Sequence, residues 1–163
     1  MDQEIRRKGS LNIGKRCSAG SLSPKMSIRL VLRSSDSQQV YNGNTPHDFM
    51  VHLPKPLYLQ GHWTISLLEF NLSVATPQPE LYVCSNLCQD SIVGDRELPL
   101  LRLVNLKMAE NIIYDYPYQV PLRLGEFQDV RVYIRDASNQ PASFLKGVTT
   151  LTLLLKKRLF EIQ

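Results

Sequence analysis

The stretch that decides the fold lies in the last third of the chain, where residues 130–136 read VRVYIRD and residues 148–155 read VTTLTLLL. In the first, apolar residues alternate with charged or aromatic ones, and the second is dense in Thr, Val and Leu. A period of two places every second side chain on one face, which is typical of a half-buried β-strand. The polar segment from Asp136 to Pro141 predicts a turn between the two strands.

The same alternation recurs toward the N-terminus and predicts eight strands in all. The six further candidates are residues 26–33, 49–53, 63–70, 81–84, 100–106 and 118–122. Pro54 and Pro56 are expected to end the second strand, and the prolines around 118–122 place that weak strand at a sheet edge. At Leu68 the apolar phase slips, which predicts either a β-bulge or a strand buried on both faces. A faint helical period over 106–113 predicts one or two helical turns.

Eight short strands separated by turn residues predict an all-β fold, as a two-sheet sandwich or a closed barrel. We expect a single eight-stranded jelly-roll sandwich over residues 26–157, with 158–163 as a C-terminal tail. The main competitor is an immunoglobulin-like sandwich, which normally carries a Cys…Trp…Cys spacing that this sequence lacks.

The whole net charge of +4 lies in residues 1–25, which hold six basic and two acidic side chains. This segment is also rich in Ser and Gly, so we expect a disordered basic N-terminal arm. A cationic arm attracts polyanions or acidic protein surfaces; the alternative is a solubilising leader without a partner. The candidate interaction residues of the arm are Arg6, Arg7, Lys8, Lys15, Arg16 and Lys25.

Hydropathy gives an expectation about compartment. No apolar run approaches the roughly 18–20 residues of a membrane helix, and the N-terminus lacks the apolar core of a secretory signal. We therefore expect a chain that stays on the cytosolic side, without a membrane partner. Cys17, Cys84 and Cys88 form a poor disulfide set, and the latter two, four residues apart, are half of a zinc site at most. Reduced, partly buried thiols are the favoured interpretation.

A search for catalytic groups predicts no enzyme, no cofactor and no metal. The sequence holds no glycine-rich phosphate loop, nucleophile elbow or zinc-protease motif. Asp95 is interpreted as a turn residue after Gly94, Glu69 as a carboxylate that faces solvent or pairs with arginine, and His52 as a surface residue. The alternating tyrosines at 114, 116 and 118 are either a stacking platform or, as we favour, an interface or core edge.

One long stretch carries a family resemblance. Residues 49–69, FMVHLPKPLYLQGHWTISLLE, resemble the LP-x-PL-x-L-x-G-x-W-x-(V/I)-x-L-x-E signature of capsid-associated proteins in Polinton (Maverick) elements and the related adintoviruses and adomaviruses. Further blocks follow in the family's order over residues 27–156: LYVC at 81–84, IVGD at 92–95, PLLR at 99–102, YQV at 118–120, FQDVRVYIRD at 127–136, FLKG at 144–147 and LTLLL at 151–155. Ser85 and Thr64 depart from the family, which has acidic residues there.

The resemblance implies a penton-like or minor capsid protein with a single jelly roll. Such a protein assembles with copies of itself, as a pentamer, at capsid vertices and contacts the major capsid protein. The arm then faces the capsid interior and touches capsid neighbours or packaged DNA, and the location is the virion, assembled in the host nucleus. The alternative is a nucleic-acid- or host-protein-binding module whose arm supplies the affinity.

Overall fold

The computed structural model describes residues 26–73, 78–106 and 111–159, and in these the chain forms eleven β-strands and no helix. The predicted all-β fold is confirmed. The strands are β1 (Ser27–Arg33), β2 (Asp48–Tyr58), β3 (Trp63–Ser73), β4 (Gln78–Ser85), β5 (Ser91–Val93), β6 (Arg96–Leu98), β7 (Leu100–Leu106), β8 (Asn111–Ile113), β9 (Val120–Pro121), β10 (Glu126–Asp136) and β11 (Lys146–Lys157).

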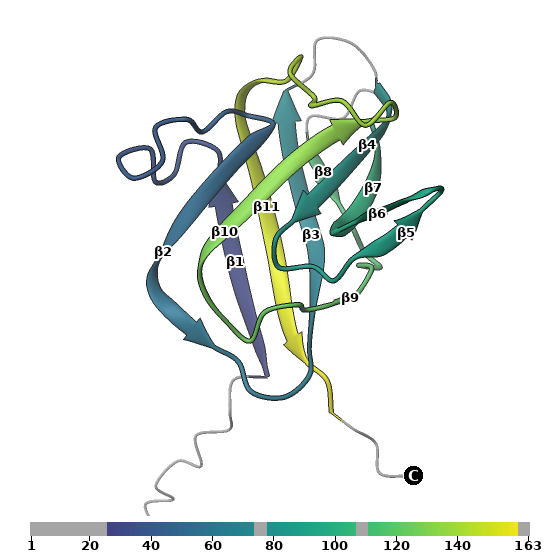
Figure 1. The fold of residues 1–163 in the computed structure, drawn as a ribbon. Coiled ribbons are helices and arrows are strands. Elements are labelled where there is room, and N and C mark those ends of the chain that lie inside the picture. The colour runs from purple at the N-terminus through teal and green to yellow at the C-terminus, as the bar shows by residue number, and fades with distance from the viewer. Residues whose placement is uncertain (1–25, 74–77, 107–110, 160–163) are drawn as a thin grey trace, which may run out of the picture.

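Two antiparallel sheets pack face to face (Figure 1). The first runs β1-β11-β3-β8, with β9 also paired to β3, and the second runs β2-β10-β4-β7. Strands β5 and β6 form a separate two-stranded ribbon that projects beside the second sheet. The first and last strands of the fold are neighbours, since Ser27 pairs with Lys156 and Arg33 with Thr150.

One apolar core fills the space between the sheets, and it uses the alternating positions that the sequence predicts. On β10, Val130 and Val132 are fully buried while Arg131 and Tyr133 between them are partly exposed. On β11, Leu151, Leu153 and Leu155 are fully buried from the opposite sheet. Burying a Val, Leu or Phe side chain is worth about 1.5–3 kcal/mol, so this core holds the sandwich together.

The predicted end of the second strand at Pro54 and Pro56 is wrong, because β2 continues to Tyr58. β2 is an edge strand whose only sheet neighbour is β10, so a missing N–H is tolerated there. The ladder also slips at this point, from a pair at His52–Asp129 to the next at Leu57–Phe127. The prolines therefore occupy a stretch in which no ladder donor is required.

The phase slip at Leu68 is a bulge, as one of the two predicted alternatives had it. Thr152 pairs with Glu69 and Leu153 with Leu67, so Leu68 is left over between them. The other predicted alternative, a strand buried on both faces, also applies at the start of β3, where Thr64 and Ser66 are each only 2% exposed.

Three strands went unpredicted, namely β5, β6 and β8. The helical turns expected over 106–113 are contradicted at 111–113, where β8 pairs with β3 through Glu69–Ile113 and Asn111–Asn71; residues 107–110 lie outside the described residues. The weak strand predicted at 118–122 is confirmed as the two-residue β9, which pairs only with β3. The helical prediction failed at 111–113 because pairing with β3, and not the short apolar sequence itself, sets the conformation of this segment.

Candidate assembly surface

Four large apolar or aromatic side chains project into solvent along one side of the sandwich. Ile92 is 81% exposed, Tyr116 92%, Tyr118 67% and Leu103 42%. We call these four residues the edge surface, because Leu103 lies on β7, the outer strand of the path β2-β10-β4-β7. Single exposed apolar residues are ordinary, but a group of them commonly marks a protein contact.

Ile92 reaches this surface through the β5–β6 ribbon. Its turn contains Gly94, whose φ of +65° lies in the left-handed region that glycine adopts without strain. Ile92 pairs with Glu97 across the ribbon, and the side chain of Asp95 at the tip is 96% exposed and 3.7 Å from the guanidinium of Arg96. The interpretation of Asp95 as a turn residue is confirmed, whereas the two strands beside it were missed.

The tyrosines reach the surface from the segment that follows β8, and Arg102 ties that segment to β7. The guanidinium carbon of Arg102 lies 3.6 Å from the centre of the Tyr114 ring, and Arg102 donates a hydrogen bond of 3.5 Å to the carbonyl of Tyr116. A cation over an aromatic face is attracted by the ring electrons. Burial raises the pKa of Tyr114, against an opposing effect of Arg102. The contact joins β7 of the second sheet to the segment that follows β8 of the first.

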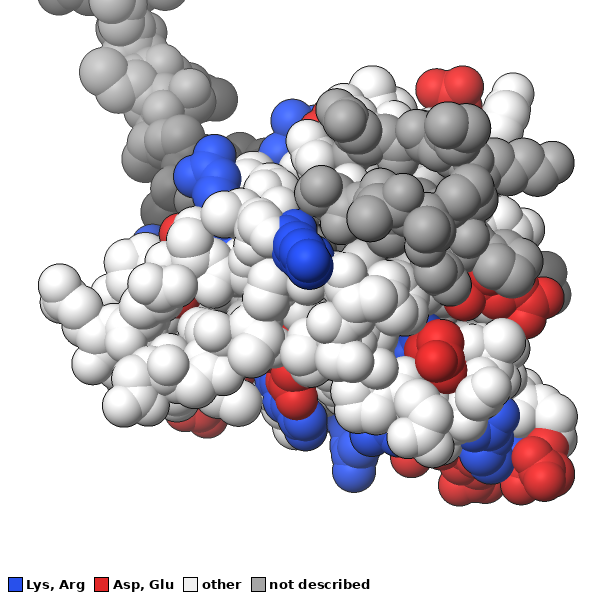
Figure 2. All heavy atoms as spheres, turned by 90° about the horizontal axis from the view of Figure 1, so that it is seen from above, with Lys and Arg blue, Asp and Glu red and all other residues white. Residues whose placement is uncertain are grey.

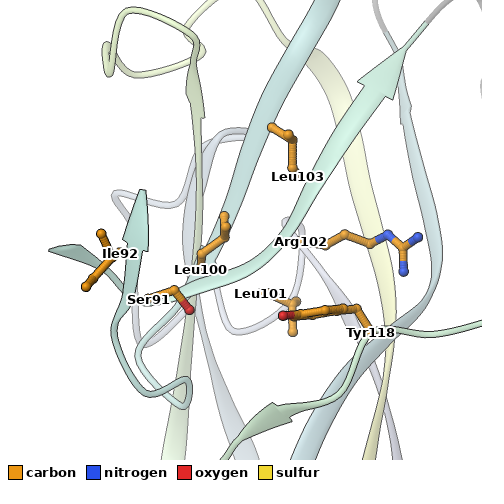
Figure 3. A pocket seen from close by; sticks show the side chains of 7 residues that line it. All are labelled: Ser91, Ile92, Leu100, Leu101, Arg102, Leu103 and Tyr118. Carbon is orange, nitrogen blue, oxygen red and sulfur yellow. The ribbon is translucent and has the colours of Figure 1, made fainter. Parts of the chain in front are cut away.

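A cavity of about 360 Å³ opens at the edge surface (Figure 3). Ile92 lies on one side of it and Tyr118 on the other, while the guanidinium of Arg102 points away from Ile92. Its walls are mainly apolar, with Arg102 as the charged lining residue, and such walls suit an apolar side chain of another protein. Of the three predicted tyrosines, Tyr114 packs against the core edge and the other two are exposed.

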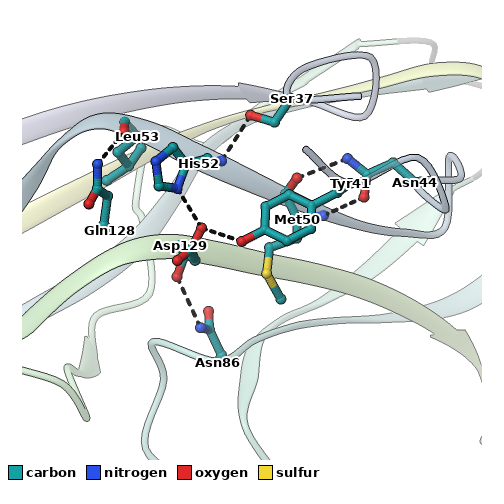
Figure 4. Close-up of polar contacts among 9 residues, drawn as sticks. All are labelled: Ser37, Tyr41, Asn44, Met50, His52, Leu53, Asn86, Gln128 and Asp129. Atoms are coloured by element: carbon teal, nitrogen blue, oxygen red, sulfur yellow. Dashed lines mark hydrogen bonds and ion pairs between the residues drawn. The ribbon is translucent and has the colours of Figure 1, made fainter. Parts of the chain in front are cut away.

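A second cluster, around Asp129, fastens the loop between β1 and β2 (Figure 4). The hydroxyl of Tyr41 hydrogen-bonds to Asp129 Oδ1, and His52 Nδ1 lies 2.8 Å from the same oxygen. These bonds, the one from Tyr41 first, lower the pKa of Asp129, and Asp129 in turn raises the pKa of Tyr41. His52 is exposed as predicted, and its backbone N–H donates to Ser37 Oγ at 2.9 Å.

This cluster holds the loop between β1 and β2 in place. Asn44 adds to it by donating to the Met50 carbonyl at 2.8 Å and accepting from the Met50 N–H at 2.9 Å. Contacts of Tyr41 and Asn44 join the loop to β10 and β2, and the contact between His52 and Asp129 joins those two strands. The side chains of His52 and Asp129 are each 41% exposed. Asn44 and Met50 line a cavity of about 270 Å³ together with Asp48 and Arg131, and none of Tyr41, His52 and Asp129 lines it.

Cys84 and Cys88, weighed above as half of a zinc site, are buried free thiols. Burial raises the pKa of Cys84 to about 11 and that of Cys88 to about 12, so both stay protonated at neutral pH. A metal ligand must be a thiolate, and the described part of the chain contains no group of three or more His, Cys, Asp or Glu that could hold an ion. Glu69 is exposed, as expected.

The arm residues Arg6, Arg7, Lys8, Lys15, Arg16 and Lys25 lie outside the described residues, as do 160–163. No protein-family model matches the sequence, and no curated protein matches it either. In the described part of the chain no helix is long and apolar enough to cross a bilayer. The edge surface is therefore the candidate site on which the functional argument rests.

Proposed function

We propose that the protein is a viral structural protein, penton-like or a minor capsid component, that works by assembling with copies of itself. The observation that carries the proposal is the edge surface, four exposed apolar or aromatic side chains beside the outer strand β7. Its role is one of shape and contact, without a chemical step or a cofactor.

The position of the edge surface favours a ring. The outer strand of a sheet presents unpaired backbone groups, which proteins usually protect with charge, proline or a covering segment. On β7 the side chain of Leu103 is instead exposed, and Tyr118 and Ile92 flank it across the cavity. A patch of this kind that packs against a different patch of the next copy is a head-to-tail contact, and such contacts form a ring when the rotation between copies closes.

The strand order supports the jelly-roll form of the proposal. Leaving aside the β5–β6 ribbon and counting β8 and β9 as one interrupted strand, eight strands remain in chain order. The strand order is first-eighth-third-sixth in one sheet and second-seventh-fourth-fifth in the other. This order results when a long hairpin of eight strands, in four antiparallel pairs, is rolled into two sheets. The resemblance of residues 27–156 to capsid-associated proteins points the same way.

In this proposal the ring has five copies, sits at a capsid vertex and contacts the major capsid protein. The capsid assembles in the host nucleus, with the basic arm toward the interior. Sedimentation velocity and electron microscopy of the purified protein test the assembly. A discrete ring-shaped oligomer is expected, and a monomer at every concentration that does not join major capsid protein contradicts the proposal.

A pair of variants tests the edge surface itself. Ile92→Lys places a charge on a side chain that is already 81% exposed and opposite Glu97 on the ribbon, so the fold of the monomer is kept while a packed contact is broken. Val40→Lys is the matched control, since Val40 is 61% exposed in the loop between β1 and β2 and outside the edge surface. We expect monomers from Ile92→Lys and rings from Val40→Lys. Rings from both variants refute the assignment of this surface.

A further inference from the structure

Both ends of the strand-built body lie at one end of the sandwich (Figure 1). There β1 begins and β11 ends, and the N–H of Lys157 donates to the carbonyl of Met26 at 2.8 Å. β2 ends and β3 begins at the same place. Basic side chains gather here, and we call this the basic end, defined by Lys55, Lys156, Lys157 and Arg158.

Two of these lysines come from opposite sheets. Lys157 is partly buried and continues the buried series of β11 that ends at Leu155. Lys55 is exposed and lies in the stretch of β2 where the ladder with β10 slips. They line the two walls of one groove of about 410 Å³.

The rest of the groove is mainly apolar, with Gln60 as a polar lining residue. Tyr58, which is 67% exposed, lines it together with Pro56 and Ile28. Trp63 also lines it but is only 8% exposed, and its indole N–H is bonded to the Gln60 carbonyl at 2.9 Å. The groove thus combines two cations with one exposed aromatic ring.

Gly61 helps to place Lys157. Its φ is +89°, and a Cβ added there would lie 3.2 Å from Lys157 Cε. The lysine stem therefore packs closely over Gly61, whose backbone conformation glycine adopts without strain.

Within residues 26–73, 78–106 and 111–159, the charges of the basic end have no ionic partner. The ion pairs of this part of the chain are His52–Asp129, Arg96–Asp95 and Arg131–Asp48, and none includes a cation of the basic end. Glu126, opposite Tyr58, contributes one exposed carboxylate nearby. At the opposite end of the molecule charges of both signs are interspersed (Figure 2).

We propose that the groove at the basic end binds single-stranded nucleic acid, with a base stacked on Tyr58 and the neighbouring phosphates on Lys55 and Lys157. Cationic grooves lined by aromatic rings bind single strands in this manner. The groove is too small for a duplex, and the basic arm is excluded as its occupant because like charges repel. The inference concerns the folded body and does not depend on assembly.

The test measures binding of a fluorescent single-stranded oligonucleotide to the full-length chain over a range of salt. Each phosphate contact contributes about 0.7 to the slope of log affinity against log salt for a single strand. The double variant Lys55→Gln/Lys157→Gln is expected to lower that slope by about 1.4. Glu126→Gln, which removes the nearby carboxylate, is expected to strengthen binding. Thermal unfolding of each variant checks that the fold is kept.

Lys146→Gln is the matched control, since Lys146 is exposed at the other end of the same strand, β11. Its slope is expected to equal that of the wild type. A double variant that behaves like this control overturns the proposal and leaves the arm as the source of any affinity.

Tyr58→Ala separates stacking from plain charge attraction. Loss of one stacked base weakens binding by about 5- to 150-fold, and the affinity for inorganic polyphosphate is expected to stay unchanged. If Tyr58→Ala leaves the affinity for the oligonucleotide unchanged, or lowers the affinities for oligonucleotide and polyphosphate equally, the groove does not hold a base and the proposal fails.

Discussion

Arg102 and Tyr114 decide whether the edge surface is held in place before any partner binds. Both side chains are partly exposed, and the guanidinium carbon of Arg102 on β7 lies 3.6 Å from the ring centre of Tyr114, which follows β8. Cation–π contacts range from about 0.5–1 kcal/mol at exposed sites to about 2 kcal/mol when desolvated, so we expect a coupling of about 1 kcal/mol here. For a chain of 163 residues that corresponds to a change of about 2–4 °C in Tm.

A double-mutant cycle measures this coupling. Arg102→Met keeps an apolar stem and removes the charge, while Tyr114→Leu keeps an apolar group and removes the ring. Urea unfolding of the wild type, both single variants and the double variant gives the free energies, at two protein concentrations so that assembly does not contribute unnoticed. A coupling below about 0.3 kcal/mol means that the two sites are independent, and the surface is then not held by this contact. Arg135 and Tyr133 provide a comparison pair with a weaker expected coupling, since the guanidinium carbon lies 5.3 Å from the ring centre.

Three further outcomes follow from buried and titrating groups. The hydrogen bonds that Asp129 accepts lower its pKa, so its stabilising effect is present above the unfolded pKa and lost as pH falls through the folded one; the stability difference between wild type and Asp129→Asn should shrink below about pH 4, and a constant difference in urea midpoint contradicts this. In a Cys17→Ser background, Cys84 and Cys88 should resist iodoacetamide at pH 8 until the protein is unfolded, because burial raises their pKa values to about 11 and about 12; rapid reaction of either native thiol refutes it. Phe70→Ala should cost about 3–5 kcal/mol of unfolding free energy, since Phe70 is 1% exposed, and a loss under 1 kcal/mol would show that the site is not core.

The long strands were predictable because a half-buried strand has apolar residues at every second position. Val130, Val132 and Ile134 have that pattern, and each is buried. The prediction that Pro54 and Pro56 end the second strand failed because proline is excluded only from positions whose N–H is paired. The sequence does not reveal that the ladder between β2 and β10 slips beside Gln128. Which donors a strand needs depends on its neighbour.

The parts of the candidate site that escaped prediction depend on contacts distant in the sequence. Tyr41 and Asp129 are 88 residues apart, and no local pattern pairs them. Ile92 escaped because a three-residue strand is too short to show a period, and an isoleucine in it is indistinguishable from a core residue. The turn signal was present in Gly94-Asp95, a two-residue loop between short apolar runs, and a hairpin there could have been predicted from it.

The hydrogen bond between Lys157 and Met26 has a consequence for how the chain can be rewired. Since β1 and β11 are sheet neighbours, a short linker from residue 157 to residue 26 would close the body into a ring of covalent bonds without disturbing a strand pair. New ends could then be opened in the exposed turn at Gly94-Asp95, where a break interrupts only the ribbon. Circular permutants of this kind tolerate cuts at exposed loop tips, and they would carry any fused label on the β5–β6 ribbon, at the side of the sandwich, and not at the end where β1 begins and β11 ends (Figure 1).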